Sequence, residues 1–442
     1  MAGGTFDKHT GKVRPGTYIN FETTKVGTVG VGERGIVVVP FVGHAYGPVG
    51  EFIAITNEAP DAAHAKLGYS VYDDNDNMLL VREALKNAKT VLVYITASGT
   101  KATANGGGVT ATAVYGGVRG NEIAYSIVAN PVGGFDVTVS LGGSTVSFYE
   151  GVKTAAELAA KNDAYVTFTG EGDLTAVAGV TLEGGTATES TNADVTTFLD
   201  KLEGVKFHTL CFPVSEETLK TAAVTKIKYL RNNVGKGVSA VLANHNGDFE
   251  GIINVTNSVE VGGKKLTNEQ ATAWVAGATA GASFVQSNTY KAYEGATAIV
   301  GVKTHEQAVA AIKNGELFFS LSEQGEIVVE YDINSLVTLG DKKDDSYKKN
   351  RVIRVFDTFA EQILLNFPPN KYNNSPTGWD IMEGVGRSIL KIFEDAGAIK
   401  NVDYKADFSV DRKASTGDQT FFNVGLEAVD SAEKLYFTIA TR

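Results

Sequence analysis

The apolar and polar positions of this chain follow two different periodic patterns. The points where the pattern changes mark the boundaries between its regions. The runs 35–40 and 90–95 are apolar at nearly every position, which predicts strands that are buried on both faces of a sheet. The segment 81–88, which precedes the second run, has helical spacing. Because strands and helices alternate, the pattern predicts an α/β core domain.

The same alternation of apolar strands and helices returns in the second half of the chain. An apolar strand is predicted at 206–214, followed by a helix with Ser215 as its N-cap. Further predicted elements are strands at 238–243 and 252–255 and helices at 267–280 and 304–313. We therefore expect one core domain in two parts, 23–97 and 195–340.

The intervening segment, 98–194, has a different composition. It is rich in Gly pairs and in alternating Thr and Val, and residues 98–195 carry four basic and ten acidic side chains. Short strands joined by Gly turns predict a β-sandwich. We interpret this segment as an acidic insertion that protrudes from the core.

The last region, 341–432, begins with a charged loop and predicts two helices, 352–365 and 379–395, followed by strands at 402–408 and 422–427. Two alternating segments lie at the ends of the chain, within an N-terminal arm (1–22) and a C-terminal arm (433–442). The predicted fold class is α+β multidomain: an α/β core interrupted by a β-sandwich insertion, followed by an α+β C-terminal domain with extended N- and C-terminal strand arms.

Composition and charge exclude several classes of function. The 442 residues carry a net charge of −11, which argues against a nucleic-acid partner, since such a partner requires a basic face. No apolar run approaches the roughly 18 residues of a membrane span, and Met1 to Thr5 lack a basic start, so we expect an unexported protein without a membrane span. The single cysteine, Cys211, excludes disulfides within the chain.

None of the short motifs that resemble an enzyme site is accompanied by the secondary structure or the residues that such a site requires. The segment 30–35 matches G-x-G-x-x-G, but a strand follows it where a dinucleotide site needs a helix. The acidic run 73–77 lacks the Gly and the Glu of a calcium loop, and the six His have no metal-ligand spacing. His208 and Cys211 lie in an apolar strand and are predicted to be structural. We therefore expect no catalytic residue, no metal and no cofactor.

One resemblance covers nearly the whole chain, including the position of the β insertion. The chain resembles the tail sheath proteins of contractile phage tails and phage-tail-like bacteriocins. The segments that carry the resemblance are Arg14 to Phe21, Arg34 to Phe41, Tyr46 to Pro48, Val81 to Ala88 and Phe422 to Ile439.

The resemblance implies a structural protein that polymerises with itself as stacked hexameric rings around an inner tail tube protein, and contracts to drive the tube through a bacterial envelope. Baseplate and tail terminator proteins would be further partners. The location would be a virion or phage-tail-like particle, assembled in the bacterial host cytoplasm. The alternative is a hydrolase or carbohydrate-binding surface protein with a Gly/Thr-rich β-sandwich recognition domain, since catalytic triads need no local motif.

The resemblance also assigns roles to the arms and to the C-terminal strands, because arms of this family complete a sheet in a neighbouring subunit. Together with the charge pattern, this gives three groups of expected residues. They are the strand donors Tyr18, Ile19, Phe21, Leu435, Phe437 and Ile439; the strand acceptors Tyr404, Phe408, Phe422, Val424 and Leu426; and the tube-facing candidates Lys348, Lys349, Arg387 and Lys391.

Overall fold

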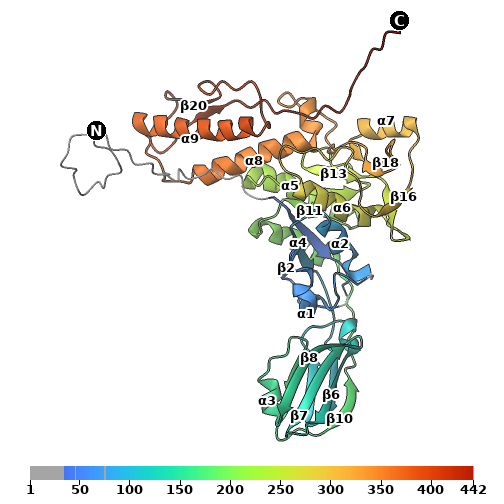
Figure 1. Cartoon of the computed structure of the whole chain (residues 1–442). Helices are drawn as coiled ribbons and strands as arrows, with labels where there is room; N and C mark the ends of the chain where they lie inside the picture. The colour runs from blue at the N-terminus through green and yellow to red at the C-terminus, as the bar shows by residue number, and fades with distance from the viewer. Residues whose placement is uncertain (1–33, 45, 74–75, 442) are drawn as a thin grey trace, which may run out of the picture.

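The computed structural model describes residues 34–44, 46–73 and 76–441, which form three structured parts. The core domain lies in the middle, a β-sandwich extends from one end of it, and helices α8 and α9 lie at the opposite end (Figure 1). The α+β multidomain class predicted from the sequence is confirmed. The N-terminal arm with its predicted strand lies outside the described residues.

The core domain is built on a seven-stranded sheet in the order β17-β13-β12-β11-β1-β3-β2. All neighbours are parallel except the edge strand β2, which is antiparallel to β3. The strands are β1 (Ile36–Phe41), β2 (Phe52–Thr56), β3 (Thr90–Ile95), β11 (Thr209–Cys211), β12 (Ser239–Ala243), β13 (Ile252–Val255) and β17 (Glu316–Leu317). Strand β1 is buried on both faces, as its unbroken apolar run predicted.

Helices cover both faces of this sheet. Apolar side chains of α2 and α6 pack on one face, and those of α4 and α5 pack on the other. The helices of this domain are α1 (His64–Leu67), α2 (Leu79–Leu85), α4 (Asn192–Lys201), α5 (Glu217–Tyr229), α6 (Asn268–Gly281) and α7 (His305–Lys313). Gly277 of α6 lies against α2 so closely that a Cβ there would be 2.3 Å from the carbonyl oxygen of Ala84. The small residues of α6 therefore set how near the two helices lie.

The predicted cap of α5 is wrong by one residue. Ser215 was expected to cap the helix, but Glu216 occupies the N-cap position, without a side-chain cap. The Lys220 N–H donates to the Glu216 carbonyl oxygen over 3.0 Å, so the helical ladder begins at Glu216. The start of α6 agrees with the prediction, because Thr267 and Gln270 form a capping box.

His208 and Cys211 are structural, as predicted. The Ile36 N–H donates to Nδ1 of His208 over 3.0 Å, and burial, aided by the charges of Arg34 and Lys206, lowers the pKa of His208 to about 3. Burial also raises the pKa of Cys211 to about 12, which leaves the thiol unreactive at neutral pH. His208 thus links its segment to β1, and Cys211 packs against Thr272 of α6.

Two small sheets flank the core near α7. They have the orders β15-β14-β16 and β18-β19. Their strands are β14 (Ser258–Val261), β15 (Lys264–Lys265), β16 (Ala296–Val300), β18 (Phe319–Leu321) and β19 (Ile327–Val329).

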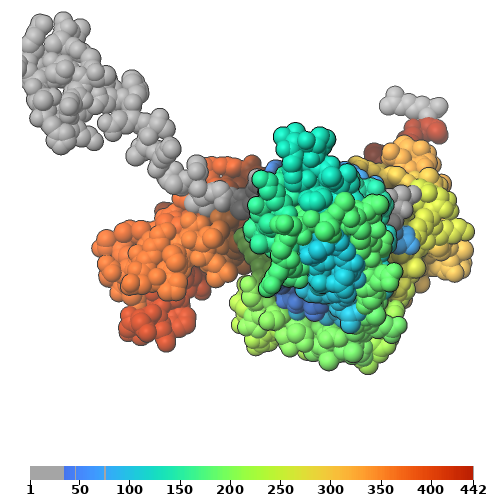
Figure 2. Space-filling model, turned by 90° about the horizontal axis from the view of Figure 1, so that it is seen from below, coloured from blue at the N-terminus to red at the C-terminus, as the bar shows by residue number. Residues whose placement is uncertain are grey.

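The insertion is a sandwich of a four-stranded sheet (β10-β6-β7-β8) and a three-stranded sheet (β4-β5-β9) with a core of its own. Its elements are β4 (Thr103–Gly106), β5 (Val109–Ala113), β6 (Ile123–Ala129), β7 (Phe135–Leu141), β8 (Ser144–Val152), α3 (Ala155–Ala159), β9 (Val166–Thr169) and β10 (Val177–Thr181). Figure 2 looks at the sandwich end-on and shows it projecting over the core domain, with the C-terminal domain to one side.

The C-terminal domain consists of α8 (Asn350–Asn366), α9 (Pro376–Asp395) and a hairpin of β20 (Phe408–Val410) and β21 (Phe422–Val424). Charged pairs join it to the core. The Arg231 guanidinium makes a bidentate contact of 2.7 and 2.8 Å with the Asp357 carboxylate of α8, and Lys343 Nζ lies 2.8 Å from Glu250 Oε1. Both partners of the first pair are largely buried, which fixes α8 against the end of α5.

We predict that replacing residues 100–186 with a short Gly/Ser linker leaves a folded core. The hydroxyls of Thr100 and Thr186 are 2.8 Å apart, so a short linker spans the gap, and the sandwich core is separate from the sheet cores. The deletion removes contacts with the core domain, among them the 2.7 Å bond between His64 Nδ1 and Tyr165 Oη, the bond from Arg119 to the Gly68 carbonyl oxygen and the packing of Tyr46 in the sandwich core. Circular dichroism should show one cooperative thermal transition and retained helix content. An unfolded product would contradict this prediction.

Candidate assembly interface

The hairpin of the C-terminal domain has only two strands. Phe408 pairs with Val424, Ser409 with Asn423 and Val410 with Phe422. The ring of Phe408 packs on α9 at Gly386, where a Cβ would lie 2.1 Å from a ring carbon. An isolated two-stranded sheet is marginally stable, so this hairpin depends on α9 and on any further strand that joins it.

The strands of the hairpin are shorter than the alternation predicted. Phe408, Phe422 and Val424 lie in β20 and β21, whereas Tyr404 lies in a turn and Leu426 follows β21. The cause is Asp403, whose carboxylate accepts the N–H groups of Lys405 and Ala406 over 3.0 and 3.2 Å. These local bonds fold 403–406 into a turn and override the alternation.

The predicted strand at 435–440 has no partner among the residues that the structure describes. Leu435, Tyr436, Phe437 and Ile439 are between 66% and 89% exposed. The arm extends away from β20 (Figure 1). Three apolar side chains on alternate positions of an exposed terminal segment form an unsatisfied apolar face. The N-terminal donors Tyr18, Ile19 and Phe21 lie outside the described residues.

A polar clamp holds the root of this arm. We use the name for Glu433 and the three side chains that bind its carboxylate: Ser287, Thr289 and Lys349. The two hydroxyls donate to Glu433 Oε1 over 2.8 and 2.6 Å, and the Lys349 ammonium pairs with Oε2. The clamp therefore attaches Glu433, whose side chain is 8% exposed, to both the core domain and the start of α8.

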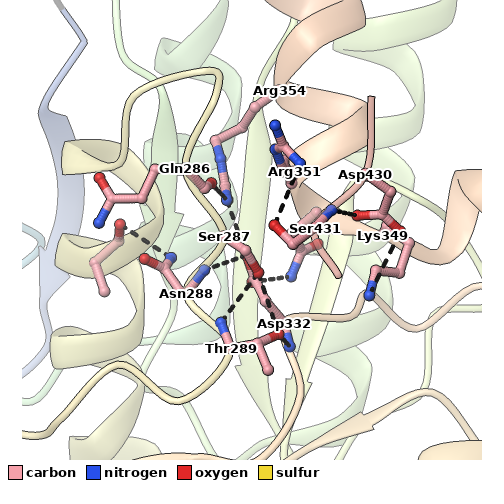
Figure 3. A network of polar contacts seen from close by, with 12 residues as sticks. Gln286, Ser287, Asn288, Thr289, Asp332, Lys349, Arg351, Arg354, Asp430 and Ser431 are labelled. Carbon is pink, nitrogen blue, oxygen red and sulfur yellow. Dashed lines mark hydrogen bonds and ion pairs between the residues drawn. The ribbon is translucent and has the colours of Figure 1, made fainter. Parts of the chain in front are cut away.

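The clamp continues into a buried network around Asp332 (Figure 3). The Asp332 N–H donates to Thr289 Oγ1 over 2.9 Å, and its carboxylate accepts Nη2 of Arg354 over 2.8 Å and Nδ2 of Asn350 over 2.8 Å. Burial alone raises the pKa of Asp332, but Arg354 and the hydrogen bonds outweigh it, so the pKa lies below its ordinary value. Asp332 is therefore ionised at neutral pH and binds α8 to the core.

The tube-facing candidates differ in exposure. Burial lowers the pKa of Lys349, whose charge is compensated by Glu433 and by Asp430 at 3.7 Å. Arg387 donates from Nη2 to Glu383 over 3.0 Å and from Nε to the Tyr404 carbonyl oxygen over 2.8 Å. Lys349 and Arg387 thus have partners within the subunit.

Lys348 and Lys391 make only pairs on their own helical turns, with Asp345 at 2.7 Å and Asp395 at 3.0 Å. The loop predicted at 341–354 is also shorter than expected, because α8 begins at Asn350 and buries Arg351 and Arg354. Arg351 donates to Ser431 Oγ over 3.2 Å and Arg354 pairs with Asp332 at 2.8 Å, and both partners come from distant parts of the chain, which the local charge run did not reveal.

The described residues hold neither a metal cluster nor a membrane-spanning helix. Among them, no group of three or more His, Cys, Asp or Glu is arranged to hold a metal ion. None of the described helices is long and apolar enough to cross a membrane. The polar clamp and the incomplete hairpin are therefore the features that call for a functional explanation.

We predict that Glu433→Ala loosens the arm root. The substitution leaves the buried Lys349 charge without its nearest carboxylate, which costs on the order of 1–3 kcal/mol. Hydrogen exchange of residues 429–434 should become faster while the core sheet is unchanged. The matched control is Glu427→Ala, which removes an exposed pair with Lys400 at 3.2 Å and should have little effect. Equal effects of the two variants would contradict the clamp.

Four family models match successive parts of the chain. They are described as Tail sheath protein Gp18 domain III N-terminal region (residues 26–94), Phage tail sheath protein beta-sandwich domain (97–201), Phage tail sheath protein central domain (188–335) and Phage tail sheath C-terminal domain (342–442).

Full-length relatives agree with these matches. The phage-like element PBSX protein XkdK of Bacillus subtilis (strain 168) is 38% identical, with 99% of each chain covered. The solved sheath tail protein of Desulfitobacterium hafniense has a TM-score of 0.83 at 36% identity, covering 96% of this chain and 99% of its own. The sheath tail protein of Listeria innocua has a TM-score of 0.78 at 37% identity, covering 92% and 95%.

A more distant likeness concerns the fold alone. The helical sheath of the anti-feeding prophage in its contracted state has a TM-score of 0.56 at 15% identity, covering 98% of this chain and all of its own. The family models and the full-length relatives decide the assignment: the chain belongs to the phage tail sheath protein family, as a structural component of a tail or phage-tail-like particle and not an enzyme.

Proposed function

We propose that this protein polymerises with itself into stacked hexameric rings around an inner tail tube and contracts to drive that tube through a bacterial envelope. The observation that carries the proposal is the pairing of two incomplete features within one subunit. Among the described residues, no further strand joins the hairpin β20–β21, and the apolar alternating segment of the C-terminal arm has no partner. Exchange of arms between subunits completes both.

Exchanged arms suit a contractile assembly for a mechanical reason. Backbone pairing of each arm with a neighbour links subunits while leaving their bodies free to change their packing. The polar clamp at Glu433 supports this role, because it ties the arm root to the core and to α8 through Lys349 and Thr289. A pull on the arm is then transmitted to both domains.

The remaining partners follow from the same role. A sheath subunit meets an inner tube protein along its length, and baseplate and tail terminator proteins at its ends. The solved anti-feeding prophage baseplate, which contains a chain of this fold at 15% identity, is a precedent for the first of these ends. The subunits are made and assembled in the cytoplasm of the bacterial host.

The arm is tested by truncation after Lys434, which keeps the clamp. We expect folded, dispersed subunits that form no rings or tubes in negative-stain micrographs. Burial of Leu435, Phe437 and Ile439 is worth on the order of 5–8 kcal/mol before the cost of ordering the arm. Normal tubes from the truncated chain would overturn the proposal.

Point variants test separately the contribution of the arm's apolar face and that of its backbone hydrogen bonds. Phe437→Asp should abolish tubes, because it places a charge in the buried face, whereas Tyr436→Asp on the opposite face serves as the matched control. Thr438→Pro removes a ladder donor if that amide faces the neighbour.

The grip on the tube is tested at Lys348, whose side chain is 34% exposed, and at Lys391, whose side chain is 63% exposed. Lys348→Glu combined with Lys391→Glu should weaken co-assembly with purified tube protein, and the loss should shrink as salt is raised, because exposed charges are screened. Lys161→Glu, an exposed position on the sandwich, is the control. Co-sedimentation measures the effect. Unchanged binding at low salt would remove both lysines from the tube surface.

A further inference from the structure

We infer that a cavity beside the C-terminal half of α8 binds a carboxylate, with the Arg34 guanidinium as the group that recognises it. The cavity has a volume of about 390 Å³ and lies between α8, the segment 204–208 that leads into β11, and the loop 235–238. Two sources of the ligand share this chemistry. One is a small carboxylate in solution, and the other is an acidic side chain of a second copy of this chain.

Arg34 is a cation without a counter-ion in this cavity. Its Nε is buried and has no hydrogen-bond partner among the residues that the structure describes. Two acids also line the cavity, but each has another partner. Asp357 accepts two hydrogen bonds from Arg231 over 2.7 and 2.8 Å, and Glu361 Oε1 lies 3.0 Å from Lys206 Nζ. A buried guanidinium that lacks a carboxylate is costly, so the site favours a ligand that supplies one.

The cavity is electropositive despite its two acids. Burial, aided by Arg354 and opposed by Asp357, lowers the pKa of Arg34 to about 10. His208 lines the same cavity, and burial together with the charges of Arg34 and Lys206 lowers its pKa to about 3. Positive charge is therefore disfavoured on both groups, and an anion in the cavity would stabilise the charged form of each.

His208 supplies a second donor on the cavity wall. Its Nδ1 accepts the Ile36 N–H over 3.0 Å, so the neutral ring carries its proton on Nε2. No hydrogen bond joins Nε2 to a residue that the structure describes. Arg34 thus provides the charge of the site, and His208 provides a neutral N–H group beside it.

The rest of the lining favours a carboxylate on a short aliphatic stem. Phe207, Val238 and Leu364 contribute apolar walls. Lys236 also lines the cavity, but its Nζ is engaged with backbone carbonyl oxygens, such as that of Val205 at 3.1 Å. Glutarate or the side chain of a glutamate therefore matches the site better than inorganic phosphate, which has no apolar part.

Titration of the full chain with glutarate tests the site. We expect glutarate to raise the melting temperature until the site is saturated, compared with sodium chloride of equal ionic strength. Arg34→Gln should weaken binding by roughly tenfold or more, because it removes the charged donor. The matched control is Arg412→Gln, which makes the same charge change at a side chain that is 46% exposed, and it should bind as the wild type does.

The His208 ring reports on the same site in the unaltered chain. Its ¹⁵N signals, assigned by comparison with His208→Gln, should shift when glutarate binds, and the pKa of His208 should rise. This measurement does not depend on whether Arg34→Gln folds. Neither measurement requires a polymer, so their failure is separate from failure of the sheath proposal.

Cross-linking tests the second copy as the source of the ligand. Arg34→Lys keeps the charge and introduces an amine, which a carbodiimide couples to a carboxylate in direct contact. Labelled (¹⁵N) and unlabelled chains are mixed before assembly, so mass spectrometry distinguishes bonds between copies from bonds within one copy, such as a bond to Glu361.

Saturable glutarate binding that Arg34→Gln weakens and Arg412→Gln leaves unchanged, with a shifted His208 signal, would uphold the site and a ligand from solution. A bond from position 34 to an acid of another copy would uphold the site and a ligand from the neighbouring copy. The inference would be overturned by equal losses in the two variants, by glutarate binding that leaves His208 unaffected, or by the absence of both glutarate binding and a bond between copies.

Discussion

Backbone hydrogen-bonding groups at a sheet edge must find partners, and this constraint governs how the subunit is used. In the seven-stranded core sheet the five inner strands are paired on both sides within the chain, and helices cover both faces. In the hairpin β20–β21, one edge is met by Glu383, which accepts the Val410 N–H, and the other has no partner in the described residues. Under the proposed exchange of arms, this edge is met within an assembly.

The junction between the core domain, α8 and the C-terminal arm depends on electrostatic interactions around Asp332. Asp332 is ionised inside the protein because Arg354, Asn350 and the Asn288 N–H all bind its carboxylate, so the cost of burying the charge is offset locally. Through Thr289 this network reaches Glu433, where the arm begins. The core domain, α8 and the arm therefore meet through hydrogen bonds and ion pairs, whose strength depends on their direction. Such contacts suit a junction whose geometry must be the same in every copy.

The two sets of contacts differ in what they fix. The clamp at Glu433 fixes where the C-terminal arm leaves the subunit, and Glu383 fixes β20 against α9. Neither involves the sandwich, whose contacts with the core, such as that between His64 and Tyr165, lie at the other end of the molecule. Changes in the sandwich therefore leave the polar clamp and the hairpin untouched.

The sequence by itself determined the elements whose apolar pattern is continuous. Strands β1 and β3, helix α6 and the separate insertion all follow from short-range periodicity and composition, because burial on one or both faces leaves a direct trace in the chain. The sequence also identified the apolar arm at Leu435 to Ile439.

Only the tertiary structure revealed the contacts between residues that lie far apart in the sequence. The charge run at 341–354 did not reveal that Lys349 pairs with Glu433 or Arg354 with Asp332, and the alternation at 402–408 did not reveal the turn held by Asp403. The blocked edge of β20 likewise depends on Glu383, which lies 27 residues from Val410 in the sequence. Such contacts are set by packing in three dimensions, and no local pattern records them.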